Sequence, residues 1–386
     1  MNGPLKTIVC GTRFGENYIS ALLEDETDFE LAGILARGSD RSRQLARDLG
    51  VPLFQNPDQV PSSVDIACVA IRSRAFRGSG DAIAEALLRK GIHVLQEHPV
   101  HPVEIRRLLA ASKEGNAVYH VNCFYSHGTA GSVFIRFLGE WRAARAPSYL
   151  TLTTSSQLLY SSLDIVGRAF GGLRDFVVGP VAPWPAGMLP DGVDAPPFQV
   201  LQGRIGSTPF VLQLQNYLDP RDPDHHSLVM HNIAAGGPEG RIELVNSFGP
   251  VVWSHAIYMP DYELDDRSAS YLHNWSSKMD NRFLSQPTAR TIGDSGGPNL
   301  ADAGMTEFPR IIHRALEELK RRIDGSGPER VIDDDGLVAL GTAWQRCVTH
   351  VGPLVECALP PPPVPVPDPA AFANGRDAKD DIKTGT

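Results

Sequence analysis

Residues 6–18 read "KTIVCGTRFGENY", and this stretch decides the fold of the first part of the chain. An apolar run ends at Gly11, and a helical pattern opens at Gly15. A strand that turns through glycine into a helix typifies a dinucleotide-binding fold, in which helix N-terminal amides hold a pyrophosphate. The full G-x-G-x-x-G fingerprint would need glycine at Arg13 and Glu16. A plain strand-to-helix turn is therefore the alternative.

The same alternation continues to residue 122. Short apolar runs, each followed by a longer amphipathic segment, are "KTIVCG", "FELAGIL", "DIACVAI", "HVLQE" and "NAVYHVN". Apolar strands joined by helices indicate a parallel sheet covered on both faces. We predict an α/β Rossmann-type domain over residues 1–122, with its ligands beyond the carboxyl ends of the strands.

The segment after the second run, "GILARGSDRSR", bears on the choice of cofactor. NAD sites usually place Asp or Glu there for the ribose 2′-hydroxyl, whereas this chain clusters arginines around Ser39 and Asp40. Arginine suits a phosphate, so the sequence predicts NADPH; a solvated helix start capped by Ser39 or Asp40 is the alternative. The arginines are Arg37, Arg41 and Arg43. The expected cofactor-binding residues are Gly11, Thr12, Arg13, Phe14, Gly15, Arg37, Ser39, Arg43, Ser73 and Glu97.

Two candidate proton donors follow the last two strands of this domain. His98 comes directly after "HVLQE", and Tyr125 comes shortly after "AVYHVN". Parallel neighbours end at the same edge of a sheet, so both side chains are expected at the nicotinamide crevice. A reductase needs a proton donor there; His98 titrates near neutral pH, and Tyr125 donates without being charged. We predict both as catalytic, the alternative being a loop histidine and a core tyrosine.

Further candidates for contact with a substrate are weaker. They are His101, His127, Gln157, Tyr160 and His226. The run "DPRDPDHHSLVMH" suggests a metal site, but on a strand its first and last histidines would lie roughly 20 Å apart. We therefore predict no metal.

The second part of the chain changes character. From residue 149, longer strand-like runs separated by turns predict a large, mostly antiparallel open sheet within an α+β domain over residues 123–355. Helices are expected over 161–172 and over "FPRIIHRALEELKRRIDG", where Glu318 and Arg322 would pair at i,i+4. A third helix follows an acidic cap in "DDDGLVALG". The Pro-rich tail over 356–386 is expected to be extended or disordered.

Composition excludes several classes of protein. The formal net charge is −9, without a basic stripe, which argues against nucleic-acid binding. No apolar run reaches membrane-spanning length, and the N-terminus lacks the features of a secretory signal. The five cysteines are scattered and show no CxxC spacing, which predicts reduced thiols and a cytoplasmic protein.

Several motifs resemble the thiazolinyl imine reductases of yersiniabactin- and pyochelin-type siderophore biosynthesis. They are "GTRFGENY", "RGSDRSRQLA", "VLQEHPVHP", "NCFYSHGTAG", "TSSQLLYSSLD", "YLDPRDPDHHSLVMH" and "SFGPVVWS". The resemblance implies NADPH-dependent reduction of a thiazoline C=N bond to a thiazolidine. The substrate would be a thioester on a carrier domain of a nonribosomal peptide synthetase, with His98 and Tyr125 as the proton donors.

More broadly, the chain resembles the glucose–fructose oxidoreductase and inositol dehydrogenase superfamily. Most members have lysine where this chain has His98 in Glu97-His98-Pro99. The superfamily resemblance implies an open sheet whose outer face often forms a homodimer interface. A sugar or polyol NADP-dependent dehydrogenase and a non-catalytic NADPH-binding accessory protein remain alternatives.

Overall fold

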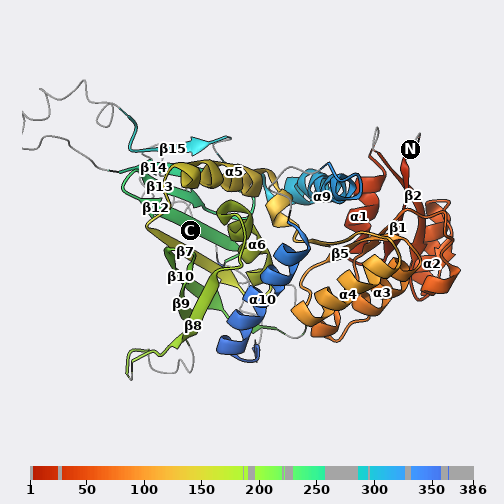
Figure 1. Cartoon of the computed structure of the whole chain (residues 1–386), viewed down its shortest axis with the longest axis horizontal. Helices are drawn as coiled ribbons and strands as arrows, with labels where there is room; N and C mark the ends of the chain where they lie inside the picture. Colours follow the sequence, from red (N-terminus) through yellow and green to blue (C-terminus); the bar gives the residue numbers. More distant parts are fainter. Residues whose placement is uncertain are drawn as a thin grey trace, which may run out of the picture.

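The structure, a computed structural model, has two large sheets with helices packed against and between them (Figure 1). It describes residues 3–24, 28–185, 187–189, 196–219, 221, 229–256, 286–293, 296–326, 332–357 and 364. In Figure 1 the first sheet lies at the right in red and orange, and the larger second sheet lies at the left in green.

The first sheet is parallel, with the order β3-β2-β1-β4-β5-β6 of a dinucleotide-binding fold. Its strands are β1 (Leu5–Cys10), β2 (Phe29–Leu35), β3 (Leu53–Phe54), β4 (Ile66–Val69), β5 (His93–Glu97) and β6 (Tyr119–Asn122). Its helices are α1 (Gly15–Leu22), α2 (Asp40–Asp48), α3 (Gly80–Arg89) and α4 (Pro102–Glu114). The predicted Rossmann-type domain is confirmed; β3, only two residues long, was not predicted.

The strands of this sheet are apolar on both faces because helices cover both. Ile8 and Cys10 of β1 point into one core with α3 and α4, and Val9 between them points into a second core with α1. This double burial explains the continuous apolar runs in the sequence.

The second sheet has eight strands in the order β15-β14-β13-β12-β7-β10-β9-β8. Neighbours run antiparallel except β7 and β10, which are parallel, so the predicted mostly antiparallel sheet is confirmed. The strands are β7 (Tyr149–Ser155), β8 (Phe176–Ala182), β9 (Gln199–Ile205), β10 (Thr208–Gln215), β12 (His231–Gly237), β13 (Gly240–Leu244), β14 (Val251–His255) and β15 (Ala289–Ile292). A separate pair joins β11 (Tyr217–Leu218) to β16 (Val355–Glu356).

Two helices, α5 (Thr129–Ala144) and α6 (Leu159–Phe170), pack against each other beside this sheet. The sequence predicted α6 but missed α5, whose N-cap Gly128 makes no side-chain capping bond and whose residues include β-branched and aromatic types. It also missed the edge strands β8 and β15. Pro180 and a register shift interrupt β8, which weakens the strand pattern.

The C-terminal helices join the two halves of the molecule (Figure 1). Short helical turns α8 (Leu300–Asp302) and η4 (Ala303–Glu307) lead into α9 (Phe308–Ile323), which packs on α1 and adds Ile312, Leu316 and Leu319 to the first domain's core. Helix α10 (Asp334–Val351) contacts α4, α6 and β8, and Asp333 caps it as predicted. All of the Pro-rich tail after Cys357 except residue 364 lies outside the described residues.

All five cysteines are free in the structure, and four of them are buried. Within the part of the chain that the structure describes, no helix is both long and apolar enough to cross a membrane.

Candidate active site

The turn between β1 and α1 is shaped for a close ligand. Gly11 has φ +99°, and a Cβ there would lie 3.1 Å from the carbonyl oxygen of Ala70. A Cβ on Gly15 would lie 3.1 Å from Cγ1 of Val9, so α1 begins at a close approach to β1. A left-handed first glycine and a tightly packed helix start are two of the three glycine roles in a dinucleotide site. The turn fits a pyrophosphate despite its incomplete fingerprint.

The polar cluster after β2 contains a helix cap and three arginines. Ser39 is the N-cap of α2 and accepts a bond from the Ser42 amide at 3.3 Å, as the capping alternative predicts. Arg41 crosses to Glu16 of α1, with 2.6 Å between guanidinium nitrogen and carboxylate oxygen. Arg37 is exposed, and the side chain of Arg43 is half-exposed. Arg37 and Arg43 are the residues of this cluster that would meet a cofactor phosphate, because Arg41 is already paired with Glu16.

His98 follows β5 and is held by one ring nitrogen. Its Nδ1 lies 2.9 Å from the carbonyl oxygen of Asn122 and 2.9 Å from Oε1 of Glu97. The ring stacks on Tyr160 with 5.8 Å between ring centroids. Among the residues that the structure describes, none hydrogen-bonds Nε2.

A buried network fixes Glu97 in turn. Its Oε2 accepts hydrogen bonds from the Tyr18 hydroxyl of α1 and from Nδ2 of Asn122, the latter at 3.3 Å. The Asn122 amide also donates to the Tyr18 hydroxyl at 2.6 Å. Because Glu97 and Asn122 are register partners on β5 and β6, the network ties the cofactor helix to the strand ends that carry His98.

This network decides the charge of His98. Burial by itself would lower the pKa of His98, but the hydrogen bond and charge of Glu97, the Asn122 carbonyl and the charge of Asp164 together raise it above its usual 6.5. The imidazolium form therefore persists to higher pH than in a free histidine.

Tyr125 lies in the turn η3 (Tyr125–His127) after β6 and is surrounded by rings. Its ring centroid lies 5.0 Å from that of Phe124, 4.7 Å from that of His231 and 5.9 Å from that of Phe248. Burial, followed by the charge of Glu97, raises the pKa of Tyr125. The hydroxyl therefore stays protonated at neutral pH.

His231 of β12 is buried against Tyr125 and bound to two serines. Nε2 lies 2.9 Å from the Ser161 hydroxyl and Nδ1 lies 2.6 Å from the Ser247 hydroxyl. Ser161 also donates to the Leu158 carbonyl at 2.9 Å. Since a hydroxyl has one proton to donate, Ser161 accepts from His231, which indicates that Nε2 carries a proton.

Behind η3 lies a buried ion cluster that the sequence did not predict. Glu318 of α9 binds Arg168 of α6 at 2.9 Å, and Arg168 also binds Asp164 at 2.8 Å. His120 and His127 lie 3.2 and 3.6 Å from the Glu318 carboxylate. The predicted Glu318–Arg322 pair is wrong, because the tertiary fold turns Glu318 inward and Arg322 toward Asp334 at 2.5 Å.

The remaining predicted residues take varied positions. Ser73 is buried and donates to the carbonyl of Pro99 at 2.7 Å, which joins the β4 end to the segment after His98. His101 is the N-cap of α4 and accepts from the Val103 amide at 3.3 Å, and Tyr160 lies under His98. Thr12 and Phe14 lie in the first turn, and Gln157 precedes α6. His226 lies outside the described residues, so these substrate assignments stay predictions.

Sequence reasoning missed Tyr18, Asn122 and His231 as parts of the site. Asn122 was within reach, since the rule that places His98 and Tyr125 at one sheet edge also places the last residues of β5 and β6 side by side. Tyr18 occupies the buried face of α1, one turn after Gly15. His231 has no local signal, because the second sheet brings it to Tyr125 from more than a hundred residues away.

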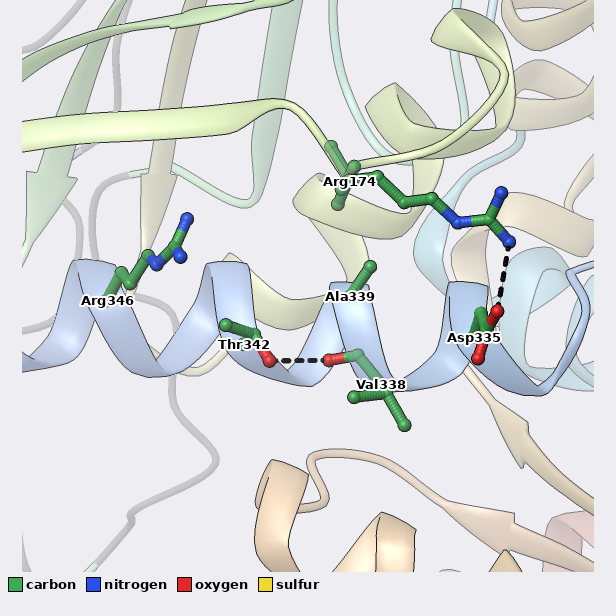
Figure 2. Close-up of a pocket in the computed structure, with 7 residues that line it drawn as sticks. Arg174, Asp335, Val338, Ala339, Thr342 and Arg346 are labelled. Atoms are coloured by element: carbon green, nitrogen blue, oxygen red, sulfur yellow. Dashed lines mark hydrogen bonds and ion pairs between the residues drawn. The ribbon is translucent and has the colours of Figure 1, made fainter.

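Two cavities lie near these elements but hold none of the predicted residues. One, of about 350 Å³, lies between α10 and the segment after α6 and is lined partly by Arg174, Asp335 and Arg346 (Figure 2). The other, of about 400 Å³, lies at the N-terminus of α5. Within the described ranges, no group of three or more His, Cys, Asp or Glu side chains is arranged to hold a metal.

Family comparisons agree with this architecture. Residues 5–123 match the oxidoreductase family with an NAD-binding Rossmann fold. Residues 145–254 match the C-terminal domain described as thiazolinyl imine reductase Irp3-like. The two matches confirm the predicted resemblance at both levels. The chain is therefore an oxidoreductase that uses a nicotinamide cofactor.

Solved structures share the fold at low sequence identity. An oxidoreductase from Sinorhizobium meliloti has a TM-score of 0.62 and 13% identity, with 90% of this chain and 97% of that chain covered. UDP-N-acetylglucosamine 3-dehydrogenase from Acidithiobacillus ferrooxidans gives 0.58 and 14%, with 90% and 97% covered. Biliverdin reductase from Synechocystis, in complex with biliverdin and NADP+, gives 0.56 and 12%, with 89% and 98% covered. No curated protein sequence matches the chain.

Proposed function

We propose that this protein reduces the C=N bond of a thiazoline to a thiazolidine, with NADPH as the reductant. The substrate is a thioester on the carrier domain of a nonribosomal peptide synthetase that builds a siderophore-type product. The observation that carries the proposal is His98, whose Nδ1 is held by Glu97 and Asn122 while Nε2 faces no described partner.

In this reaction the C=N carbon gains a hydride and the nitrogen gains a proton. NADPH, when bound, supplies the hydride. Glu97 and the Asn122 carbonyl hold Nδ1–H of His98, which orients Nε2–H toward the substrate nitrogen. His98 donates that proton and becomes neutral, and the raised pKa keeps the donor form available near neutral pH.

Tyr125 has a supporting role in this proposal. Its hydroxyl is a weak acid because burial raises its pKa. Its ring, packed against Phe124 and His231, forms an uncharged wall for the substrate next to the donor.

The polyol dehydrogenase alternative conflicts with the charge of His98. Oxidation of an alcohol needs a base that accepts the hydroxyl proton, and Glu97 favours the form of His98 that is already protonated. Turnover of a polyol with NADP+ at neutral pH would support the alternative.

The test is mass spectrometry of a carrier domain loaded with a hydroxyphenyl-thiazolinyl thioester and incubated with the protein and either NADPH or NADH. The proposal predicts a gain of two hydrogens, faster with NADPH. Replacing Arg37 and Arg43 together with alanine should erase that preference, whereas Arg47→Ala on the exposed side of α2 should keep it. Cofactor binding without any gain on the tethered imine would contradict the proposal and favour a non-catalytic accessory protein.

A further inference from the structure

The cavity at the N-terminus of α5 is large enough for a ligand. Its volume of about 400 Å³ lies within the roughly 300–1,000 Å³ typical of small-molecule sites. It is bordered by α5, the segment between β13 and β14, the end of β15 and the start of α9. Its lining includes Thr129 and Ala130 of the motif "NCFYSHGTAG" and residues 248–251 of the motif "SFGPVVWS", none of which was given a role above.

This cavity shares a wall with the active site. Phe248 lines the cavity, and its ring centroid lies 5.9 Å from that of Tyr125. Phe308 supports the same ring at 6.0 Å. A ligand that contacts Phe248 in the cavity would therefore lie against a ring that neighbours Tyr125.

The cavity is lined by apolar side chains, glycines and one arginine. Val133, Pro250 and Ile292 provide apolar contact, and several glycines leave the backbone open to an approaching chain. Arg310 is the one cationic side chain among the lining residues. Such walls suit an extended, flexible chain that carries amides along its length and an anion at one end.

An ion pair with Glu307 holds the side chain of Arg310 in place. One guanidinium nitrogen binds Oε2 of Glu307 at 3.0 Å, while Oε1 of Glu307 accepts the Thr129 amide at the start of α5 at 2.7 Å. Arg310 remains 53% exposed, whereas Glu307 is 9% exposed. A guanidinium has five N–H donors, so the fork keeps donors for a phosphate after it has bound Glu307.

We infer that this cavity receives the phosphopantetheine arm of the carrier domain, with the phosphate at Arg310 and the thioester end directed past Phe248 toward Tyr125. The inference rests on the proposed function, since it names how the tethered substrate enters the same site. The arm is the shared chemistry of carrier domains and coenzyme A.

The first test measures binding alone. Pantetheine 4′-phosphate is titrated into the protein by calorimetry, with saturating NADP+ present to occupy the arginine cluster near α2. Arg310→Glu and, independently, Val133→Trp should each weaken binding at least about tenfold, the effect of losing a good charged contact or the cavity space. Arg321→Glu, exposed on the same helix but outside the lining, is the matched control and should change binding less than about twofold.

No binding by the wild type, or equal binding by all four proteins, would overturn the inference. Two variants that act on different walls guard against one misfolded protein, and thermal unfolding checks both. Binding of the holo carrier domain, the apo carrier domain and coenzyme A is then compared, because the arm occurs in both the holo carrier domain and coenzyme A. The inference predicts that the holo form binds more tightly than the apo form and than coenzyme A, and equal binding of holo and apo forms would contradict it.

The second test compares two substrates, the carrier-tethered thiazoline and its N-acetylcysteamine thioester, which lacks the arm. The ratio of their kcat/KM values should fall at least about tenfold in Arg310→Glu. An unchanged ratio would overturn the inference while the proposed function stands. Reduction of neither substrate by the wild type would instead overturn the proposed function.

Discussion

Two histidines at one edge of the first sheet are buried to a similar degree and have opposite pKa shifts. The side chain of His98 is 9% exposed and that of His127 is 7% exposed. The pKa of His98 is raised, whereas burial, partly offset by the charge of Glu318, lowers the pKa of His127 to about 4.

The difference lies in what each carboxylate is already bound to. Glu97 lies 2.9 Å from Nδ1 of His98, and it also accepts hydrogen bonds from the neutral side chains of Tyr18 and Asn122. Glu318 lies 3.6 Å from His127 and is bound to Arg168, whose own charge also disfavours a second cation. The effect of burial on the pKa is therefore the larger one at His127, whereas the effect of the carboxylate is the larger one at His98. A histidine that favours its protonated form therefore follows β5, and a histidine that favours its neutral form follows β6.

The largest expected effect is on the donor itself. His98→Ala should lower kcat for the tethered thiazoline by at least about 10²-fold, the usual scale for loss of a general acid. Tyr125→Phe, which keeps the ring and its packing, should cost less than about tenfold. Steady-state kinetics of both variants test this ranking, and a near-normal rate for His98→Ala would remove it from the mechanism.

The next effect is on stability and concerns His127. Its folded pKa of about 4 lies below the unfolded value near 6.5, so the unfolded chain binds the proton first as the pH falls. Stability present above pH 6.5 should therefore be lost between about pH 6.5 and 4, by roughly 3 kcal/mol. Urea unfolding of the wild type and His127→Asn measures the difference, and parallel pH curves would show that His127 is not buried in its neutral form.

Glu97→Gln should then make the donor resemble an ordinary histidine. Loss of the carboxylate lowers the pKa of His98, so the protonated donor is lost at a lower pH and the alkaline limb of the rate profile moves downward. At a pH above the alkaline limb of both proteins, the rate should fall about tenfold for each unit of that shift. The dissociation constant for NADPH serves as the control, because a loss of cofactor binding would mimic the fall. An alkaline limb that stays in place would contradict the assigned role of Glu97.

The smallest effect on the rate is expected for Tyr18→Phe, which should not shift the alkaline limb downward as Glu97→Gln does. This change removes a hydroxyl that donates to Glu97 and accepts from Asn122, but it leaves the carboxylate. Glu97 loses one hydrogen-bond donor and keeps its charge beside His98, so the alkaline limb of the rate profile should not move downward. We expect a rate change below about threefold together with a measurable loss of stability, because buried polar groups lose a partner. A downward shift like that of Glu97→Gln would show that Tyr18 acts on His98 by another route.

The sequence was sufficient for the parts of the molecule that depend on local pattern. The strand–helix alternation through residue 122 predicted the parallel sheet, and the rule that parallel strands end together placed His98 and Tyr125 on one edge. The cap of α10 and the buried stripe of α9 follow from spacing alone. These features depend on residues close together in the chain.

What the sequence could not provide depends on contacts between distant segments. Glu318 looked like the partner of Arg322 on an exposed helix face, but α9 packs under the first domain and turns this carboxylate toward Arg168. His231 reaches Tyr125 only through the pairing of β12 with β7. The direction of a histidine's pKa shift likewise depends on whether the neighbouring carboxylate is already paired with an arginine. The spacing of residues in the sequence does not predict such a pair.

The measurement that tests the account most directly is the pH dependence of single-turnover reduction of the tethered thiazoline by the wild type, His98→Ala and Tyr125→Phe. If His98 donates the proton, the rate profile should have an alkaline limb above pH 6.5 in the wild type and in Tyr125→Phe, and no such limb in the slow residual reaction of His98→Ala. A limb that survives in His98→Ala and disappears in Tyr125→Phe would contradict this role of His98 and assign the proton to the tyrosine.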